Sequence, residues 1–175
     1  MRTRHLIACC LAALSVAAAG CAEEKAEDAR SGSGSTEEAS EASGGVPTTE
    51  GAPGEKPTVT IPEGAEPPTE LQIKDIAPGE GPAAKEGDQL QLNYHGVSFS
   101  SGEEFDSSFG RDPIDVQLGT GGVIPGFEQG LVGMKAGGRR QITIPPDLAY
   151  GPQGSPPAIG PNETLVFVLD VTSIN

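Results

Sequence analysis

The stretch Val123-Ile124-Pro125-Gly126-Phe127-Glu128-Gln129-Gly130-Leu131, followed by Val132-Gly133-Met134, decides the fold of this chain. It predicts one short helix, because Pro125 suits a first helical turn, where its missing N–H costs no hydrogen bond. Phe127, Leu131 and Met134 recur at helical spacing and form a single apolar stripe. We expect Gly137 and Gly138 to end the helix.

Two glycines inside this stretch indicate how the helix is held. Gly130 and Gly133 each lower helix stability by about 1 kcal/mol relative to alanine, so packing must stabilise the helix, and close approach to a sheet is the expected reason. The Val123–Ile124 end combines apolar side chains with an unpaired helix-start N–H, which suits an apolar ligand that carries a carbonyl. Taken alone, the segment fits a plain core helix equally well.

Composition limits the classes of function. The chain has 175 residues, 25 acidic and 11 basic side chains, and a net charge of −14. Such an acidic chain is poorly suited to nucleic acids or anionic membrane surfaces, and we expect a soluble monomer. All seven aromatic side chains lie between positions 94 and 167, so the packed core belongs to this part of the chain.

The first 21 residues have the pattern of an export signal. Arg2 and Arg4 precede the apolar run Leu6–Ala19, which is too short for a membrane-spanning helix and predicts a signal peptide over residues 1–20. Cys21 follows small residues, as in the bacterial lipobox, so we expect a lipid on this cysteine and attachment to the extracytoplasmic side of the cell membrane. Ala18 stands where the lipobox usually has Leu, and ordinary secretory cleavage is the alternative.

Residues 21–68 are predicted to be the lipidated cysteine followed by a disordered acidic linker rich in Pro, Gly and Ser. Their larger apolar residues after Cys21 are only Val46, Val59 and Ile61, too few to form a core. From residue 69 the pattern changes to strands. Alternating or continuous apolar runs predict strands near residues 71–76, 89–95, 114–118, 139–144 and 165–171. Several antiparallel strands and one short helix predict an α+β domain over residues 69–175.

Three sequence blocks carry a family resemblance. They are Tyr94-His95-Gly96 with Phe105-Asp106-Ser107-Ser108, then Val123–Leu131, then Ala149-Tyr150-Gly151 with Pro161–Phe167. Together they resemble the FKBP-type peptidyl-prolyl cis-trans isomerases over residues 70–175. The resemblance implies a five- or six-stranded antiparallel sheet wrapped around one short helix, with a proline-binding pocket between them and no cofactor or metal.

The resemblance also implies site residues. Of these, Phe105, Asp106, Ile124 and Tyr150 are the expected catalytic residues. The full expected substrate-binding set is Tyr94, Phe105, Asp106, Arg111, Ile114, Val123, Ile124, Phe127, Tyr150, Ile159 and Phe167. Arg111 would pair with Asp106 or Tyr94. Phe127 takes the position where the family usually has Trp, and Ser155 and Ala158 replace a usual His and a larger aliphatic residue, which should weaken binding of bulky macrolides.

The expected chemistry needs no nucleophile. No nucleophile–base pair, metal cluster or phosphate loop is evident in the sequence, and His95 should point away from Tyr94 on its strand. The rotation barrier of an X-Pro bond comes from amide resonance, and an apolar pocket favours the less polar twisted amide. Asp106 either faces the twisting carbonyl carbon or only organises the pocket.

The sequence therefore predicts an isomerase that acts on X-Pro bonds of exported proteins while they fold, with macrolides as possible inhibitors. A non-catalytic proline-peptide binding module, or a holdase chaperone at the cell envelope, is the alternative.

Overall fold

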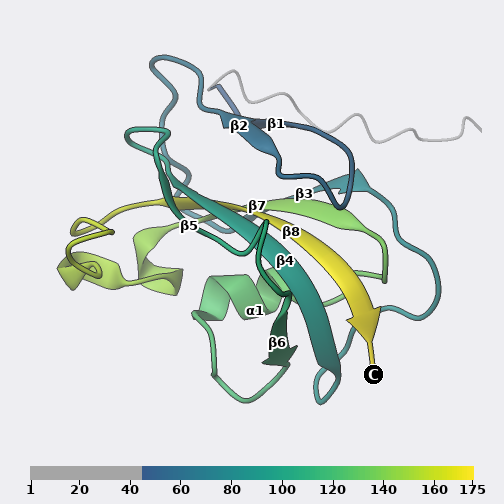
Figure 1. Cartoon of the computed structure of the whole chain (residues 1–175). Coiled ribbons are helices and arrows are strands. Elements are labelled where there is room, and N and C mark those ends of the chain that lie inside the picture. Colours follow the sequence, from purple (N-terminus) through teal and green to yellow (C-terminus); the bar gives the residue numbers. More distant parts are fainter. Residues whose placement is uncertain (1–44) are drawn as a thin grey trace, which may run out of the picture. The chain divides into compact units, whose positions relative to one another are not determined.

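The computed structural model describes residues 45–175 (Figure 1). The expected signal peptide, Cys21 and the linker up to residue 44 lie outside the described residues. Within residues 45–175, no helix has both the length and the apolar character needed to cross a membrane.

A six-stranded antiparallel sheet forms the centre of the described region (Figure 1). Five strands follow in the order β3 (Gln72–Ala77), β7 (Arg139–Ile144), β8 (Leu165–Ile174), β4 (Gln89–Ser98) and β5 (Glu104–Ser107). The sixth strand, β6 (Ile114–Gln117), pairs with the first part of β4. The first seven residues of β8 are all buried, which confirms that this continuous apolar strand is covered on both faces.

The short helix α1 (Pro125–Leu131) packs against one face of the sheet, which we call the inner face. Phe127 and Leu131 of α1 are buried in the main core, as predicted, and Met134 is buried there too, although it follows the end of the helix. The glycines permit this close approach. A Cβ atom on Gly126 would lie 2.3 Å from Ile144 Cγ2, and one on Gly130 would lie 2.8 Å from Ile142. The expectation of close helix–sheet contact is therefore confirmed at Gly130.

The predicted end of the helix at Gly137 and Gly138 is wrong, because α1 ends at Leu131. Val132 has extended dihedral angles, with φ −58° and ψ 132°, and Gly133 adopts a positive φ of 81°. Gly133 thus serves a turn rather than a close contact. Arg140 of β7 donates hydrogen bonds to the carbonyls of Gly130 (2.8 Å) and Val132 (2.9 Å), which places a cation at the helix C-terminus.

The loop between β7 and β8 contains two short 3₁₀ helices, η1 (Pro146–Leu148) and η2 (Gly151–Gln153). This loop carries Tyr150 and Ile159, two of the expected site residues.

Residues 45–68, which we call the strap, are ordered against the other face of the sheet, the outer face. The prediction that these residues belong to a disordered linker is wrong. The strap contains β1 (Thr48–Glu50) and β2 (Thr58–Thr60), which pair as an antiparallel hairpin (Figure 1). Three of its side chains, Val59, Ile61 and Ala65, pack on a small outer-face core made of Val97, Phe99 and Val166.

A buried ion pair fixes the turn of the strap. Arg139 and Asp170 join at 2.6 Å on the outer face and are almost inaccessible to solvent. Arg139 also donates to the carbonyls of Gly51 (2.8 Å) and Glu55 (2.6 Å), and Asp170 accepts from the Gly54 N–H (2.7 Å). These bonds satisfy donors and acceptors that would otherwise be buried without partners. The strap therefore folds by using apolar and charged surface that distant strands supply.

Candidate active site

Four aromatic side chains meet on the inner face, and we call them the aromatic cluster. They are Tyr94 of β4, Phe105 of β5, Phe127 of α1 and Phe167 of β8. Phe167 lies at the centre, with its ring centroid 5.1 Å from that of Phe127 and 5.4 Å from that of Phe105, both in edge-to-face geometry. Tyr94 stands edge-on to Phe127 at 6.2 Å. Such edge-to-face pairs are favourable, so the cluster is a well-defined apolar surface.

Gly96 makes this arrangement possible. A Cβ atom at Gly96 would lie 2.6 Å from Phe105 Cζ and 2.9 Å from Phe167 Cε1. Any side chain there would push the two rings out of place. A glycine in the middle of a predicted strand, as in Tyr94-His95-Gly96, was the sequence signal for such a close approach.

A set of hydrogen-bonded polar side chains borders the aromatic cluster. The Tyr94 hydroxyl donates to Asp106 Oδ2 at 2.5 Å, and Arg111 Nη2 donates to Asp106 Oδ1 at 3.0 Å. Arg111 also donates to the carbonyl of Ser107. The expected pairing of Arg111 with Asp106 is therefore present in the structure. With the Ser107 N–H (2.8 Å), three donors reach the half-exposed Asp106 carboxylate.

These contacts fix the charge states at the site. Burial disfavours the Asp106 carboxylate, but hydrogen bonds from Tyr94, the Ser107 N–H and Arg111, together with the charge of Arg111, outweigh burial and lower its pKa. Burial, followed by the hydrogen bond to Asp106 and its negative charge, raises the pKa of Tyr94 to about 12. At neutral pH the site therefore holds an ionised carboxylate beside a neutral phenol.

Two serines after Asp106 anchor the loop to β4. Ser108 Oγ accepts from the Tyr94 N–H (2.9 Å) and donates to Asn93 Oδ1 (3.1 Å), while Ser107 Oγ donates to the Tyr94 carbonyl (3.2 Å). Neither serine was predicted to have a role, although both belong to the block Phe105-Asp106-Ser107-Ser108. Their hydrogen bonds to the Tyr94 backbone and to Asn93 hold the segment that carries Asp106 beside Tyr94.

The remaining expected site residues differ in how deeply they are buried. Ile114, Val123 and Ile124 are half-buried against the main core, and Ile159 is buried within it. Ile124 is the N-cap of α1, and its N–H has no hydrogen-bond partner among residues 45–175. Tyr150 lies at the N-cap of η2 with 42% of its surface exposed, and its hydroxyl has no partner in the same region.

His95 lies on the outer face, as predicted from its alternation with Tyr94. It is buried beneath the strap, and its Nδ1 lies 3.5 Å from Glu104 Oε2. Burial lowers the pKa of His95, whereas the nearby Glu104 acts in the opposite direction. This histidine is on the far side of the sheet from Asp106 and takes no direct part in the site.

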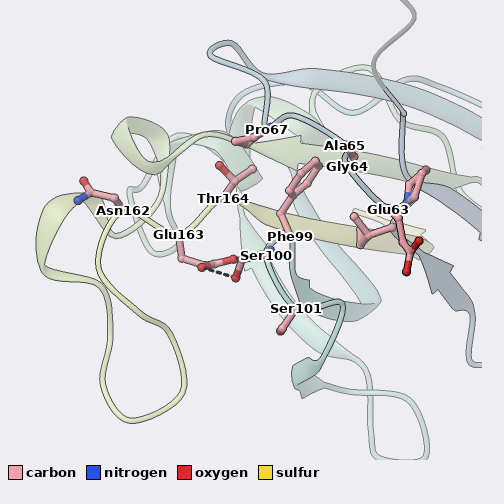
Figure 2. Close-up of a pocket in the computed structure, with 12 residues that line it drawn as sticks. Glu63, Gly64, Ala65, Pro67, Phe99, Ser100, Ser101, Asn162, Glu163 and Thr164 are labelled. Atoms are coloured by element: carbon pink, nitrogen blue, oxygen red, sulfur yellow. Dashed lines mark hydrogen bonds between the residues drawn. The ribbon is translucent and has the colours of Figure 1, made fainter.

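Figure 2 shows a separate cavity of about 490 Å³ on the outer face. Strap residues, Phe99, the β4–β5 turn and the loop before β8 line it. Glu163 of that loop accepts hydrogen bonds from the Ser100 N–H (3.0 Å) and the Ser100 hydroxyl (2.9 Å). These hydrogen bonds connect the β4–β5 turn to the loop before β8.

Comparisons with known proteins agree with this geometry. The sequence model of the FKBP-type peptidyl-prolyl cis-trans isomerase family matches residues 81–172. An FK506-binding protein of Streptomyces anulatus is 52% identical over 113 residues, which cover 63% of this chain and 91% of that protein. A probable FK506-binding protein of Corynebacterium glutamicum is 47% identical over 115 residues, covering 66% of this chain and 95% of that protein.

Among solved structures, FkpA from Escherichia coli is similar, with a TM-score of 0.54 and 40% sequence identity. The match covers 60% of this chain and 48% of FkpA. The strap lies outside the family match, which begins at residue 81, whereas the aromatic cluster, Asp106, Arg111 and Tyr150 all lie inside it. The chain belongs to the FKBP-type family and is a peptidyl-prolyl cis-trans isomerase.

Proposed function

We propose that this isomerase acts on X-Pro bonds of exported proteins while they fold, and that the aromatic cluster receives the proline ring. The observation that carries this proposal is the position of the ionised Asp106, which Arg111 holds, and which accepts a hydrogen bond from Tyr94 of the aromatic cluster and follows Phe105 in the chain. Phe127 and Phe167 are buried and form the floor, whereas Tyr94 and Phe105 are half-exposed and form the walls.

The reaction is a rotation, so the site needs no covalent step. The barrier of about 18–20 kcal/mol reflects the loss of amide resonance as the C–N bond twists. A twisted amide is less polar than a planar one, so an apolar surface stabilises the twisted state relative to the planar, better hydrated state. The aromatic cluster provides this surface.

Polar groups at the rim would orient the substrate. The Ile124 N–H and the Tyr150 hydroxyl are donors without protein partners in the described region, and each is suited to a carbonyl that flanks the proline. The Asp106 carboxylate would face the carbonyl carbon of the twisting bond. Because Tyr94 and Arg111 fix both of its oxygens, it is ready in position before substrate binds.

Export and lipid attachment are part of the proposal. The signal pattern of residues 1–20 and the single cysteine that follows it, Cys21, support a lipid-anchored protein on the extracytoplasmic side of the membrane. A diacyl or triacyl cysteine would anchor the protein stably. Mass spectrometry of the native N-terminus tests this point, and an unmodified Cys21 or cleavage at another position would contradict it.

Macrolide binding is also part of the proposal, because the two bacterial relatives are named as FK506-binding proteins. We propose that FK506 competes with substrate for the aromatic cluster, with reduced affinity. Phe127 offers less area than Trp and no indole N–H, and Ala158 offers only a methyl group at the rim.

The test is the cis–trans rate of a proline peptide with the full chain and three variants. Asp106→Leu and Tyr150→Phe should each lower kcat/KM by roughly 3- to 30-fold, because orienting and electrostatic groups contribute such factors without a covalent step. Asp112→Asn is the matched control, since Asp112 is exposed in the same loop as Arg111. Wild-type rates in both site variants would overturn the assignment. Proline-peptide binding without any turnover would instead identify a binding module.

A further inference from the structure

The strap contacts the segment that carries the site residues from the opposite side of the sheet. β5 is an edge strand of four residues, and its register against β4 shifts between Gly96 and Val97. It presents Phe105 to the aromatic cluster, while its neighbour Glu104 reaches the outer face beside His95. A short edge strand with an irregular register has few backbone bonds to fix it, so side-chain contacts must contribute to its position.

One such contact comes directly from the strap. Lys56 Nζ lies 2.7 Å from Glu104 Oε2, the same oxygen that faces His95 Nδ1 at 3.5 Å. His95 is neutral at pH 7, because burial lowers its pKa, so Lys56 is the cation that balances Glu104. The pair ties the strap to the residue immediately before Phe105.

A second contact runs through the buried arginine that anchors the strap. The Arg139 guanidinium, which holds the carbonyls of Gly51 and Glu55, lies 5.8 Å from the centroid of the Phe109 ring. This is the geometry of a cation–π interaction. Phe109 stands between Ser108 and Arg111 in the loop that positions Asp106. The strap therefore contacts the site segment directly before Phe105, through Lys56, and indirectly after Asp106, through Arg139 of β7.

From these two contacts we infer that the strap is a positioning element for the isomerase site, with Lys56 and Phe109 as positioning residues for Phe105, Asp106 and Arg111. Neither residue contacts the aromatic cluster or the expected substrate surface. They act from the outer face by restraining the segment Glu104–Arg111. The inference rests on the proposed function, but its structural part, the placement of Asp106 beside Tyr94, can be measured without turnover.

The phenol of Tyr94 provides that measurement. The chain has two tyrosines and no tryptophan, so tyrosinate absorbance in a Tyr150→Phe background reports Tyr94 alone. Burial and the adjacent Asp106 raise the pKa of Tyr94 to about 12. If Asp106 moves away, the part of this rise that Asp106 causes is lost and the pKa falls, while the larger part that burial causes remains. A variant that only lowers overall stability, yet remains folded, would not move it.

The test compares Lys56→Met and Phe109→Leu with Lys56→Arg as the conservative variant. Lys74→Met is the matched control, because Lys74 is an exposed lysine of β3, at the far edge of the sheet from β5. We expect Lys56→Met to lower kcat/KM about 2- to 5-fold, as for an exposed ion pair. Phe109→Leu should lower it about 3- to 10-fold, because displacement of a site loop is more costly than loss of one exposed pair. Both should lower the pKa of Tyr94, while Lys56→Arg and Lys74→Met behave as wild type.

Two results would overturn the inference. One is an unchanged Tyr94 titration in both Lys56→Met and Phe109→Leu, whatever their activity. The other is additive losses of kcat/KM in Lys56→Met, Glu104→Gln and the double variant, since residues of one contact must be coupled. If the wild-type chain shows no isomerase activity, the proposed function fails, and the Tyr94 titration still decides whether the strap positions Asp106.

Discussion

The Tyr94 hydroxyl donates a 2.5 Å hydrogen bond to Asp106, and this contact joins the central strand β4 to the edge strand β5. Although burial disfavours the charged form of Asp106, hydrogen bonds from Tyr94, the Ser107 N–H and Arg111 lower its pKa, while burial and then the hydrogen bond to Asp106 raise the pKa of Tyr94. A contact between two residues that are 12 positions apart in the sequence therefore helps to move both pKa values further from neutral pH.

Removal of this hydrogen bond should shift the titration of Asp106. In Tyr94→Phe the carboxylate loses one of the donors that lower its pKa, so the pKa should rise relative to wild type. Carboxyl carbon shifts in NMR spectra of wild type and Tyr94→Phe measure this directly. An unchanged Asp106 titration would show that Arg111 and the Ser107 N–H alone set its charge.

Deletion of the strap should destabilise the domain. A chain that begins at residue 69 loses the burial of Val97, Phe99 and Val166 and the three strap hydrogen bonds to Arg139 and Asp170. We expect a loss of roughly 2–5 kcal/mol in the free energy of unfolding relative to a chain that begins at residue 45. Urea denaturation measures the difference. Equal midpoints would restore the sequence-based boundary at residue 69.

The buried His95 should make stability depend on pH. Burial lowers its pKa in the folded state below the ordinary value near 6.5, so the unfolded chain binds the proton more tightly. The stabilising contribution of neutral His95 is therefore complete above about pH 6.5 and is lost as the pH falls toward the folded-state pKa. Glu104 opposes this effect, whereas Lys56 and Arg139 add to it.

Unfolding measured at about pH 7.5 and 5.5 in wild type and His95→Gln tests this dependence. The wild-type chain should lose more stability than the variant on acidification. A larger loss in the variant would contradict the assignment of His95 as the titrating group.

Substitution of the helix glycines should be destabilising even though alanine favours helices. Gly130→Ala gains about 1 kcal/mol in helix propensity but places a Cβ atom 2.8 Å from two carbons of Ile142. Overpacking of this kind costs about 1–3 kcal/mol, so we expect a net loss. Thermal denaturation of Gly130→Ala, with and without Ile142→Ala, separates the two effects. A more stable Gly130→Ala protein would show that α1 can move away from β7.

Periodicity in the sequence was sufficient to predict most of the fold. The spacing of Phe127 and Leu131 predicted one buried helix face, and the continuous apolar run of β8 predicted burial on both faces. The end of α1 was predicted too far along the chain because Gly133, whose positive φ makes it the turn residue after the helix, was interpreted as a close contact with the sheet. The hydrogen bonds that Arg140 of β7 supplies to the helix C-terminus are not evident from the helix sequence. The meeting of Tyr94, Asp106 and Arg111 followed from the family resemblance, not from periodicity.

The order of the strap was not predicted from the sequence, and the reason is physical. Its composition is that of a linker, with few large apolar residues, and its folded state depends on surface provided elsewhere. The hydrogen bonds that hold its turn to Arg139 and Asp170 span 84 to 116 residues of sequence. A buried arginine and aspartate on one sheet face require polar partners, but the sequence does not reveal that Gly51, Gly54 and Glu55 supply them.

We propose that proline binds at an apolar site bordered by the Asp106 carboxylate. The most direct test is the catalysed rate for Leu-Pro and Glu-Pro peptides at two salt concentrations. We expect Leu-Pro to isomerise faster than Glu-Pro, because the residue before proline would lie near the apolar side chains of Ile159 and Ile114. The net charge of −14 should disfavour Glu-Pro most strongly at low salt, where screening is weak. No acceleration of Leu-Pro, or a preference for Glu-Pro at low salt, would contradict it.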